Sequence, residues 1–311
     1  MSLNPIAQAL NHVNTLILDG ALATELEARG CNLADALWSA KVLMENPELI
    51  YQVHYDYFAA GANVAITASY QATPQGFATR GLSAEQARAL IGLSVSLAQR
   101  ARDDYRAASG STAPLLVAGS VGPYGAYLAN GAEYRGDYAL PEAEMKAFHR
   151  PRVAALLDAG VDLLACETLP SFAEAQALVS LLADYPDASA WFSFTLRDAQ
   201  HISDGTPLHA VAALVNSAKQ VAAVGINCVA LTDVTAALHT LQAVTDKPLL
   251  VYPNSGEQYD AVSKTWHSAP SGCTLHDHFA AWQQAGARLV GGCCRTTPQD
   301  IAAIAACCQP Q

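Results

Sequence analysis

Three of the eight cysteines stand where they could hold a metal ion. Cys228 ends one apolar run, and Cys293 and Cys294 end another, directly after Gly291 and Gly292. Three thiolates supply three ligands to a zinc ion and leave its fourth tetrahedral position open. Adjacent residues of a strand point to opposite faces, so both cysteines can bind one ion only if the chain leaves the strand conformation there. We expect the two glycines to permit that turn, because glycine tolerates backbone angles that other residues avoid.

Such a site favours alkylation of a substrate thiol over hydrolysis. A free thiol is mostly protonated at neutral pH, whereas a thiol bound to zinc is deprotonated, and the thiolate is the nucleophile. Three cysteine thiolates outweigh the charge of the ion, which weakens it as a Lewis acid and leaves the bound sulfur electron-rich. The sequence therefore predicts one zinc ion per chain and an open position for a substrate thiol.

Other polar residues follow the apolar runs in the same way. Lone acids are usually structural, but acids at two strand ends beside a thiol cluster favour a functional role. We take Glu167 as catalytic together with the three cysteines. The candidate residues around the cysteines are Asp19, Gly20, Ser69, Tyr70, Glu167 and Asn227.

The remaining chemical groups have simpler interpretations. We expect the other cysteines to bind nothing; they are Cys31, Cys166, Cys273, Cys307 and Cys308. The segment 276–278 (HDH) is a rival metal site, but it reads as the start of a helix, where such neighbours diverge. The loop 119–125 has the spacing GxxGxxG rather than GxGxxG, so we interpret it as a turn close to substrate and not as a dinucleotide site.

Composition narrows the class of protein. Half of the 311 residues are apolar and 14% are charged, which suits a large buried core. The net charge of −11 argues against nucleic acid as a partner. Residues 1–14 contain no Lys or Arg and no continuous apolar stretch, and no apolar run is long enough for a membrane span. We expect a cytoplasmic protein with reduced thiols.

Short apolar runs alternate with segments of helical periodicity along the whole chain. The runs are continuously apolar, as in strands buried on both faces; they are 15–19, 63–68, 114–120, 161–167, 190–195, 222–228, 248–253 and 288–292. The helical segments are 47–60, 83–106, 141–159, 171–183, 207–217, 233–244, 275–285 and 298–308.

Eight such pairs predict a single (β/α)8 barrel over residues 1–311, with a doubly wound open sheet as the competitor. No linker rich in Pro, Gly or Ser divides the chain. In a barrel the carboxyl ends of the strands meet at one rim, and active sites are built there. The polar residues that follow the runs would therefore surround one site.

These residues resemble the homocysteine S-methyltransferase family over almost the full chain. The segments that carry the resemblance are LDGALATEL (18–26), AGANVAITASYQATPQGF (60–77), AGSVGPYGAYLANGAEYRGDY (118–138), ACETLP (165–170), GINC (225–228), YPNSGE.YD (252–260) and GGCCRTTP (291–298). The resemblance implies a zinc site of Cys228, Cys293 and Cys294. It also implies that Asp19-Gly20 and Glu167 hold the amino-acid end of homocysteine, with Glu167 on its ammonium group, and that Asn227 shapes the site beside the metal.

The resemblance also bears on the methyl donor. The segments 118–138 and 252–260 look most like the branch that uses S-methylmethionine or S-adenosylmethionine. In the betaine-using branch a tyrosine follows the strand-four glutamate, where this chain has Thr168. Trp38 is similar to a family tryptophan that faces the cationic donor, and a sulfonium beside Trp38 or Tyr70 would gain about 0.5–2 kcal/mol; ordinary packing is the alternative for both rings. The expected reaction is in-line displacement of a neutral thioether by homocysteine thiolate.

Several alternatives stay open at this stage. The enzyme could take the methyl group from betaine or a folate, although folate- and cobalamin-dependent relatives carry further domains. A protein with structural zinc or redox-active cysteines is a different class, but structural zinc normally has four protein ligands. We expect no long C-terminal arm of the kind that assembles the betaine branch, which favours a monomer or weak homodimer. The sequence does not rank S-methylmethionine against S-adenosylmethionine.

Overall fold

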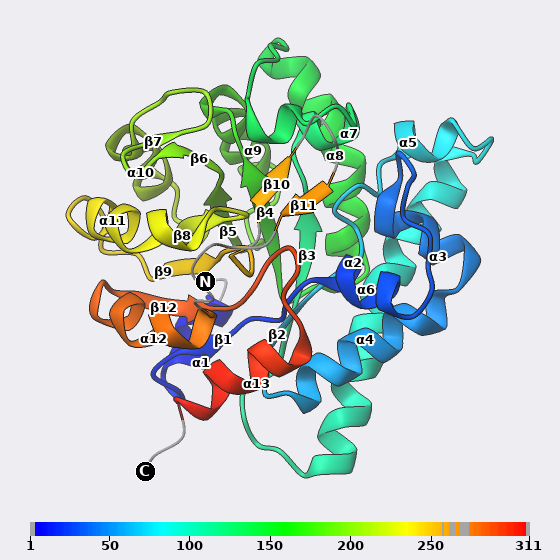
Figure 1. Cartoon of the computed structure of the whole chain (residues 1–311). Helices are drawn as coiled ribbons and strands as arrows, with labels where there is room; N and C mark the ends of the chain where they lie inside the picture. The colour runs from blue at the N-terminus through cyan, green and yellow to red at the C-terminus, as the bar shows by residue number, and fades with distance from the viewer. Residues whose placement is uncertain (1–3, 257, 261–264, 268–273, 309–311) are drawn as a thin grey trace.

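Eight parallel strands form a barrel in the computed structural model, which describes residues 4–256, 258–260, 265–267 and 274–308 (Figure 1). Cys273 and Glu257 lie outside the described residues. Going round the sheet, the strands are β1 (Leu16–Ile17), β12 (Ala287–Val290), β9 (Leu249–Tyr252), β8 (Val221–Asn227), β5 (Ala190–Phe194), β4 (Leu163–Leu169), β3 (Leu116–Val121) and β2 (Val64–Ile66). A parallel bridge between Leu18 and Val64 links the two ends of this order. The (β/α)8 prediction is confirmed, and the open doubly wound sheet is excluded.

The eight expected helices surround the strands (Figure 1). They are α4 (Pro47–Ala59), α6 (Ala84–Ser109), α8 (Glu142–Asp158), α9 (Phe172–Leu182), α10 (Leu208–Ser217), α11 (Leu231–Gln242), α12 (Leu275–Gln284) and α13 (Pro298–Ala306). The sequence pattern missed the short elements, because three to seven residues carry too little periodicity. Those that concern the site are α1 (Pro5–Leu10), η1 (Trp38–Lys41), α7 (Tyr124–Tyr127) and η2 (Ala132–Tyr134).

Local sequence sets where the helices begin and end. Ser83 and Gln86 form a reciprocal capping box at the start of α6, and Thr297 and Asp300 form one at the start of α13. Ser171 accepts the N–H of Glu174 at the start of α9. Four glycines that closely follow helices have positive φ, as is common where a helix ends; they are Gly61, Gly110, Gly160 and Gly286.

Alternation along the strands separates an inner core from an outer one. Leu163 and Ala165 of β4 belong to the core inside the barrel, whereas Leu164 and Cys166 belong to the core beneath the helices. The same two-residue period directs Glu167 inward at the carboxyl end of β4. Buried Cys166 therefore faces the helix layer, as expected for a cysteine that binds nothing.

The barrel interior is filled with side chains. Trp191 and Tyr252 are its largest members, and both are almost completely buried. Ile6 of α1 packs against the same inner core, and Asn4 lies beside the amino ends of β8 and β9. The site must therefore lie at the opposite, carboxyl ends of the strands. Within the described part of the chain, no helix combines the length and apolar character needed to cross a bilayer.

Candidate metal and substrate site

The three cysteines from two distant stretches converge at the carboxyl ends of β8 and β12. The Sγ atoms of Cys228, Cys293 and Cys294 all lie within 4.8 Å of one another. Cys228 has a left-handed φ of 52° directly after β8. The backbone N–H groups of Cys228 and Cys293 donate to Tyr252 O (3.2 Å) and Pro253 O (2.7 Å). The end of β9 therefore fixes both arms of the cluster.

The chain leaves the strand conformation before the two adjacent cysteines, as expected, but for a different reason than glycine flexibility. Neither Gly291 nor Gly292 has a positive φ; the left-handed residue of this turn is Arg295, with φ 67°. Glycine is required at both positions because there is no space for a side chain. A Cβ on Gly291 would lie 2.5 Å from Leu18 Cβ, and one on Gly292 would overlap the side chain of Thr296.

Cys228 and Cys293 are joined as a disulfide, with their Cα atoms 5.6 Å apart, and Cys294 is free. This pairing stands in place of the reduced thiols that we expect in the metal-bound form. Both sulfurs must be reduced before they can bind a metal ion. The pKa of the Cys294 thiol is raised to about 12, chiefly by burial and to a smaller extent by the charge of Glu133, whereas hydrogen bonds from its own backbone N–H and from Tyr134 oppose this rise.

Glu167 lies on the inner face of the barrel, held by two hydroxyl groups. Ser120 donates to Oε1, and the Tyr252 hydroxyl donates to Oε2 at 3.0 Å. Burial raises the pKa of Glu167 to about 7, although both hydrogen bonds favour the carboxylate. The predicted Ser69 lies behind this group, since its hydroxyl donates to Ser120 O (2.7 Å). Ser69 thereby positions Ser120 rather than presenting a free hydroxyl.

Asp19 and Gly20 end the strand that neighbours β12. Asp19 Oδ2 accepts the N–H of Ile66 (2.8 Å). Burial raises the pKa of Asp19 well above its usual value, and the charge of Glu167 adds to this effect. A Cβ on Gly20 would lie 2.8 Å from both Thr296 Oγ1 and Tyr57 Oη, so close packing requires glycine here.

Asn227 and Thr168 connect the metal cluster to the predicted aromatic pair. Asn227 accepts the Thr168 N–H and donates to its Oγ1, both at 2.8 Å. Thr168 in turn forms a hydrogen bond with the Tyr70 hydroxyl. The Trp38 ring meets Tyr70 edge-on, with centroids 5.9 Å apart. Trp38 and Thr168 both have positive φ, which places local backbone strain at the rim.

The geometry agrees with the comparisons to known proteins. The family model for homocysteine S-methyltransferase matches residues 16–308. The chain belongs to this family. It is 65% identical over 304 residues to the homocysteine S-methyltransferase of Escherichia coli, which covers 97% of this chain and 98% of that protein.

Two crystal structures of the E. coli homocysteine methyltransferase MmuM share the fold of this methyltransferase. The one described as the metallated form has a TM-score of 0.90 at 61% identity and covers 97% of this chain and 99% of that one. The one described as the oxidized form has a TM-score of 0.90 at 62% identity and covers 98% and 99% of the two chains.

The sequence alone did not select several groups that shape this methyltransferase site. Ser120 and Tyr252 hold Glu167. Both lie in segments that carry the family resemblance and at strand ends, where a site residue is expected, so this signal could have identified them. Glu133 and Tyr134 of η2 lie in the segment 118–138 that carries the resemblance, but periodicity did not single them out, since this loop has no recognisable period. Their positions depend on how the long connection after β3 folds back over the rim.

A buried ionic network lies beneath the aromatic pair. Arg152 is fully buried on α8 and donates to Tyr70 O (2.6 Å) and Gly122 O (2.5 Å). His149 Nδ1 lies 3.1 Å from the same guanidinium, and its Nε2 lies 2.7 Å from Glu174 Oε1. Burial lowers the pKa of Arg152 to about 10, so the guanidinium stays charged. The network fixes the two loops that carry Tyr70 and Gly122.

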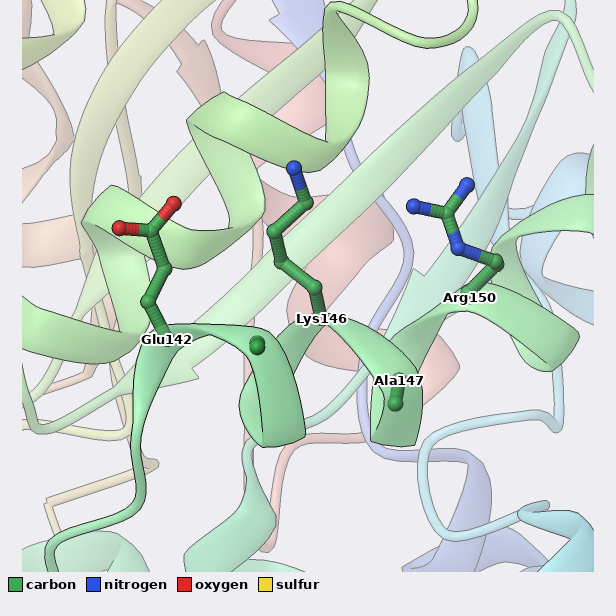
Figure 2. A pocket seen from close by; sticks show the side chains of 5 residues that line it. Glu142, Lys146, Ala147 and Arg150 are labelled. Carbon is green, nitrogen blue, oxygen red and sulfur yellow. The ribbon is translucent and has the colours of Figure 1, made fainter.

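Two other features do not contribute to the site. The segment 276–278 starts α12, where Asp277 accepts the N–H of Thr274, so the helical interpretation of this rival metal site is confirmed. A surface hollow along α8 is lined by Glu142, Ala143, Lys146, Ala147 and Arg150 (Figure 2). Its basic groups already have partners: Lys146 donates to Ser180 and Arg150 to Asp184.

Proposed function

We propose that the protein is a zinc-dependent homocysteine S-methyltransferase that takes its methyl group from a sulfonium, S-methylmethionine or S-adenosylmethionine. The observation that carries this proposal is the convergence of Cys228, Cys293 and Cys294 at the barrel rim. Homocysteine is the substrate named for the E. coli relative, and a thiol is the group that a thiolate-rich metal site activates.

The cysteine cluster fits a zinc ion. Sulfurs bound to one zinc lie roughly 3.8 Å apart, since each is about 2.3 Å from the metal, and the three Sγ atoms here lie within 4.8 Å of one another. Cys228, Cys293 and Cys294 would hold the ion once the disulfide is reduced. When bound, zinc supplies an open position at which a substrate thiol is deprotonated. Such thiols belong in a reducing compartment, which supports a cytoplasmic enzyme.

The surrounding residues would orient the two substrates. Glu167 would bind the ammonium of homocysteine, with Asp19 beside it and Asn227 fixing the wall next to Cys228. Trp38 and Tyr70 would face the sulfonium of the donor. The thiolate sulfur then attacks the methyl carbon, and the electron pair of the broken C–S bond stays on the departing thioether. No general acid is needed, because that leaving group is neutral.

Thr168 supports a sulfonium rather than betaine as the donor. It occupies the position where the betaine branch carries a tyrosine, and its short side chain is engaged with Asn227 and Tyr70. The space beside the cysteines is therefore shaped by a threonine. We also retain the prediction of a monomer or weak homodimer, which ultracentrifugation tests.

The decisive assay supplies reduced, zinc-loaded protein with homocysteine and one donor at a time. We expect methionine from S-methylmethionine or S-adenosylmethionine and none from betaine, with one zinc per chain. Cys293→Ser should lose both zinc and activity by more than about a hundredfold. Cys307→Ser, at an exposed cysteine on α13, is the matched control. Full zinc and full activity in Cys293→Ser, or turnover with betaine alone, would overturn the proposal.

A further inference from the structure

The 3-10 helix η2 brings a carboxylate to the donor side of the rim. The backbone of Glu133 is fixed, because Thr195 Oγ1 donates to its carbonyl oxygen (3.1 Å) and a Cβ on Gly125 would lie 2.7 Å from its nitrogen. η2 packs against β4, the strand that carries Glu167 and Thr168 at its carboxyl end. The charge of the Glu133 side chain also raises the pKa of the Tyr70 hydroxyl, second only to burial. Glu133 therefore belongs to the same rim as the aromatic pair.

One oxygen of this carboxylate is buried without a partner. Among the described residues, Glu133 is the only acid with a buried carboxylate oxygen that lacks a hydrogen bond. The other two acids of the rim are already held: Asp19 accepts the Ile66 N–H, and Glu167 accepts the Ser120 and Tyr252 hydroxyls. A buried, unpaired carboxylate oxygen is costly, so Glu133 Oε2 calls for a donor beyond those that the described residues supply.

The chemistry of the methyl donor identifies which of its groups can pair with Glu133. S-methylmethionine and S-adenosylmethionine each carry a sulfonium and an α-ammonium. A sulfonium has no N–H or O–H to donate, whereas an ammonium has three N–H donors. In S-methylmethionine only the ammonium can complete the hydrogen bonding of Glu133, and the faces of Trp38 and Tyr70 remain for the sulfonium.

We propose that Glu133 binds the α-ammonium of the methyl donor and so selects an amino-acid sulfonium. This inference rests on the proposed function, and it adds a second ammonium site to that of Glu167. The ammonium charge does not change during methyl transfer, so its pairing with Glu133 holds the donor equally before and during the reaction. A carboxylate paired with the sulfonium would instead stabilise a charge that the reaction removes.

The test is Glu133→Gln, which keeps the shape of the side chain and removes its charge. With reduced, zinc-loaded protein, KM for S-methylmethionine should rise by about tenfold or more, while KM for homocysteine and the zinc content stay within about twofold of the wild type. Glu133→Asp should recover part of the loss. Asp137→Asn, at an exposed acid of the same connection that pairs with Arg135, should match the wild type.

A second methyl donor distinguishes whether Glu133 pairs with the ammonium or with the sulfonium. Trimethylsulfonium has no ammonium, so Glu133→Gln should use it as well as the wild type does. An equal loss with both donors would place Glu133 on the sulfonium and overturn the inference. A rise in KM for homocysteine alone, or no change with any substrate, would also overturn it.

Calorimetric binding of S-methylmethionine to the reduced protein without homocysteine gives the same comparison between wild type and Glu133→Gln without turnover. If the wild type makes no methionine from a sulfonium, the proposed function fails, whereas unequal binding to wild type and Glu133→Gln would still support the ammonium site.

Discussion

The side chain of Asn227 is paired twice with Thr168, once through the backbone N–H and once through the hydroxyl. All the groups involved are buried. The pairing holds Thr168 at a φ of 59°, a conformation that a β-branched residue rarely adopts. It thus joins the ends of β8 and β4 directly beside Cys228.

Asn227→Ala should destabilise the protein by about 2–4 kcal/mol, because it leaves two buried polar groups of Thr168 without partners. We also expect kcat/KM to fall, since Thr168 holds the Tyr70 hydroxyl. Urea denaturation and steady-state kinetics measure the two effects. Asn216→Ala, at an exposed asparagine that donates to Val244 O, is the control. Equal stability losses for the two variants would contradict this role of Asn227.

The activity should show a step near neutral pH that belongs to Glu167. Burial raises the pKa of this group to about 7, so the carboxylate that pairs with an ammonium forms only as the pH rises through that value. We expect kcat/KM for homocysteine to increase with pH through about 7, a range below the titration of a free thiol. Glu167→Gln should have low activity without this step. If Glu167→Gln keeps the step, the group responsible lies elsewhere.

Arg152→Lys should loosen the donor side of the site. Lysine cannot reproduce the planar fork that bonds Tyr70 O and Gly122 O together. We expect a stability loss of about 2–4 kcal/mol and a larger rise in KM for the donor than for homocysteine. Arg150→Lys changes an exposed arginine two positions away that pairs with Asp184, and should leave both properties intact. A stability loss in which both KM values rise equally would reduce Arg152 to a purely structural residue.

His54 should make the fold sensitive to acid. It is completely buried on α4, neither ring nitrogen has a partner, and burial lowers its pKa to about 4. The unfolded chain therefore takes up the proton first, below its usual pKa of about 6.5, and stability falls as the pH drops from there towards 4. Between pH 7 and pH 5 the His54 contribution to this loss should be about 2 kcal/mol.

His54→Leu removes that titration and should flatten the dependence of the unfolding free energy on pH. His209→Gln, at an exposed histidine, should keep the slope of the wild type. The unfolding free energies of all three proteins at the two pH values decide the point. An unchanged slope in His54→Leu would assign the acid sensitivity to another group, such as buried His149.

The fold was predictable because each barrel strand is buried on both faces. Apolar runs such as 161–167 stand out for that reason, and glycines such as Gly160 mark the helix ends. The same logic placed Cys228 and Glu167 at one rim, because the carboxyl ends of parallel strands meet. Short elements such as η2 follow no period, so periodicity could not predict that Glu133 and Tyr134 return to the site, although both lie in the segment 118–138 that resembles the family.

The details of the site depended on contacts that a linear pattern cannot contain. The glycines before Cys293 are required by the side chains of Leu18 and Thr296, which arrive from other parts of the chain. Ser69 ended behind Ser120 because the second layer of hydroxyls is visible only in three dimensions. Arg152 lies in a helix that has the pattern of an ordinary outer helix, and its buried partners are Tyr70 O and Gly122 O from two other segments and His149 from the same helix.

The packed interior of the barrel also determines from which side substrates reach the site. Below Glu167 the described residues leave the barrel filled, because Trp191 and Tyr252 meet edge-on beneath the carboxylate and Ile6 packs at the far end. Substrates therefore reach Glu167 from the rim. Under the proposed function, homocysteine on Glu167 would lie deeper than the donor, so we expect homocysteine to bind first and a donor that binds earlier to block its entry.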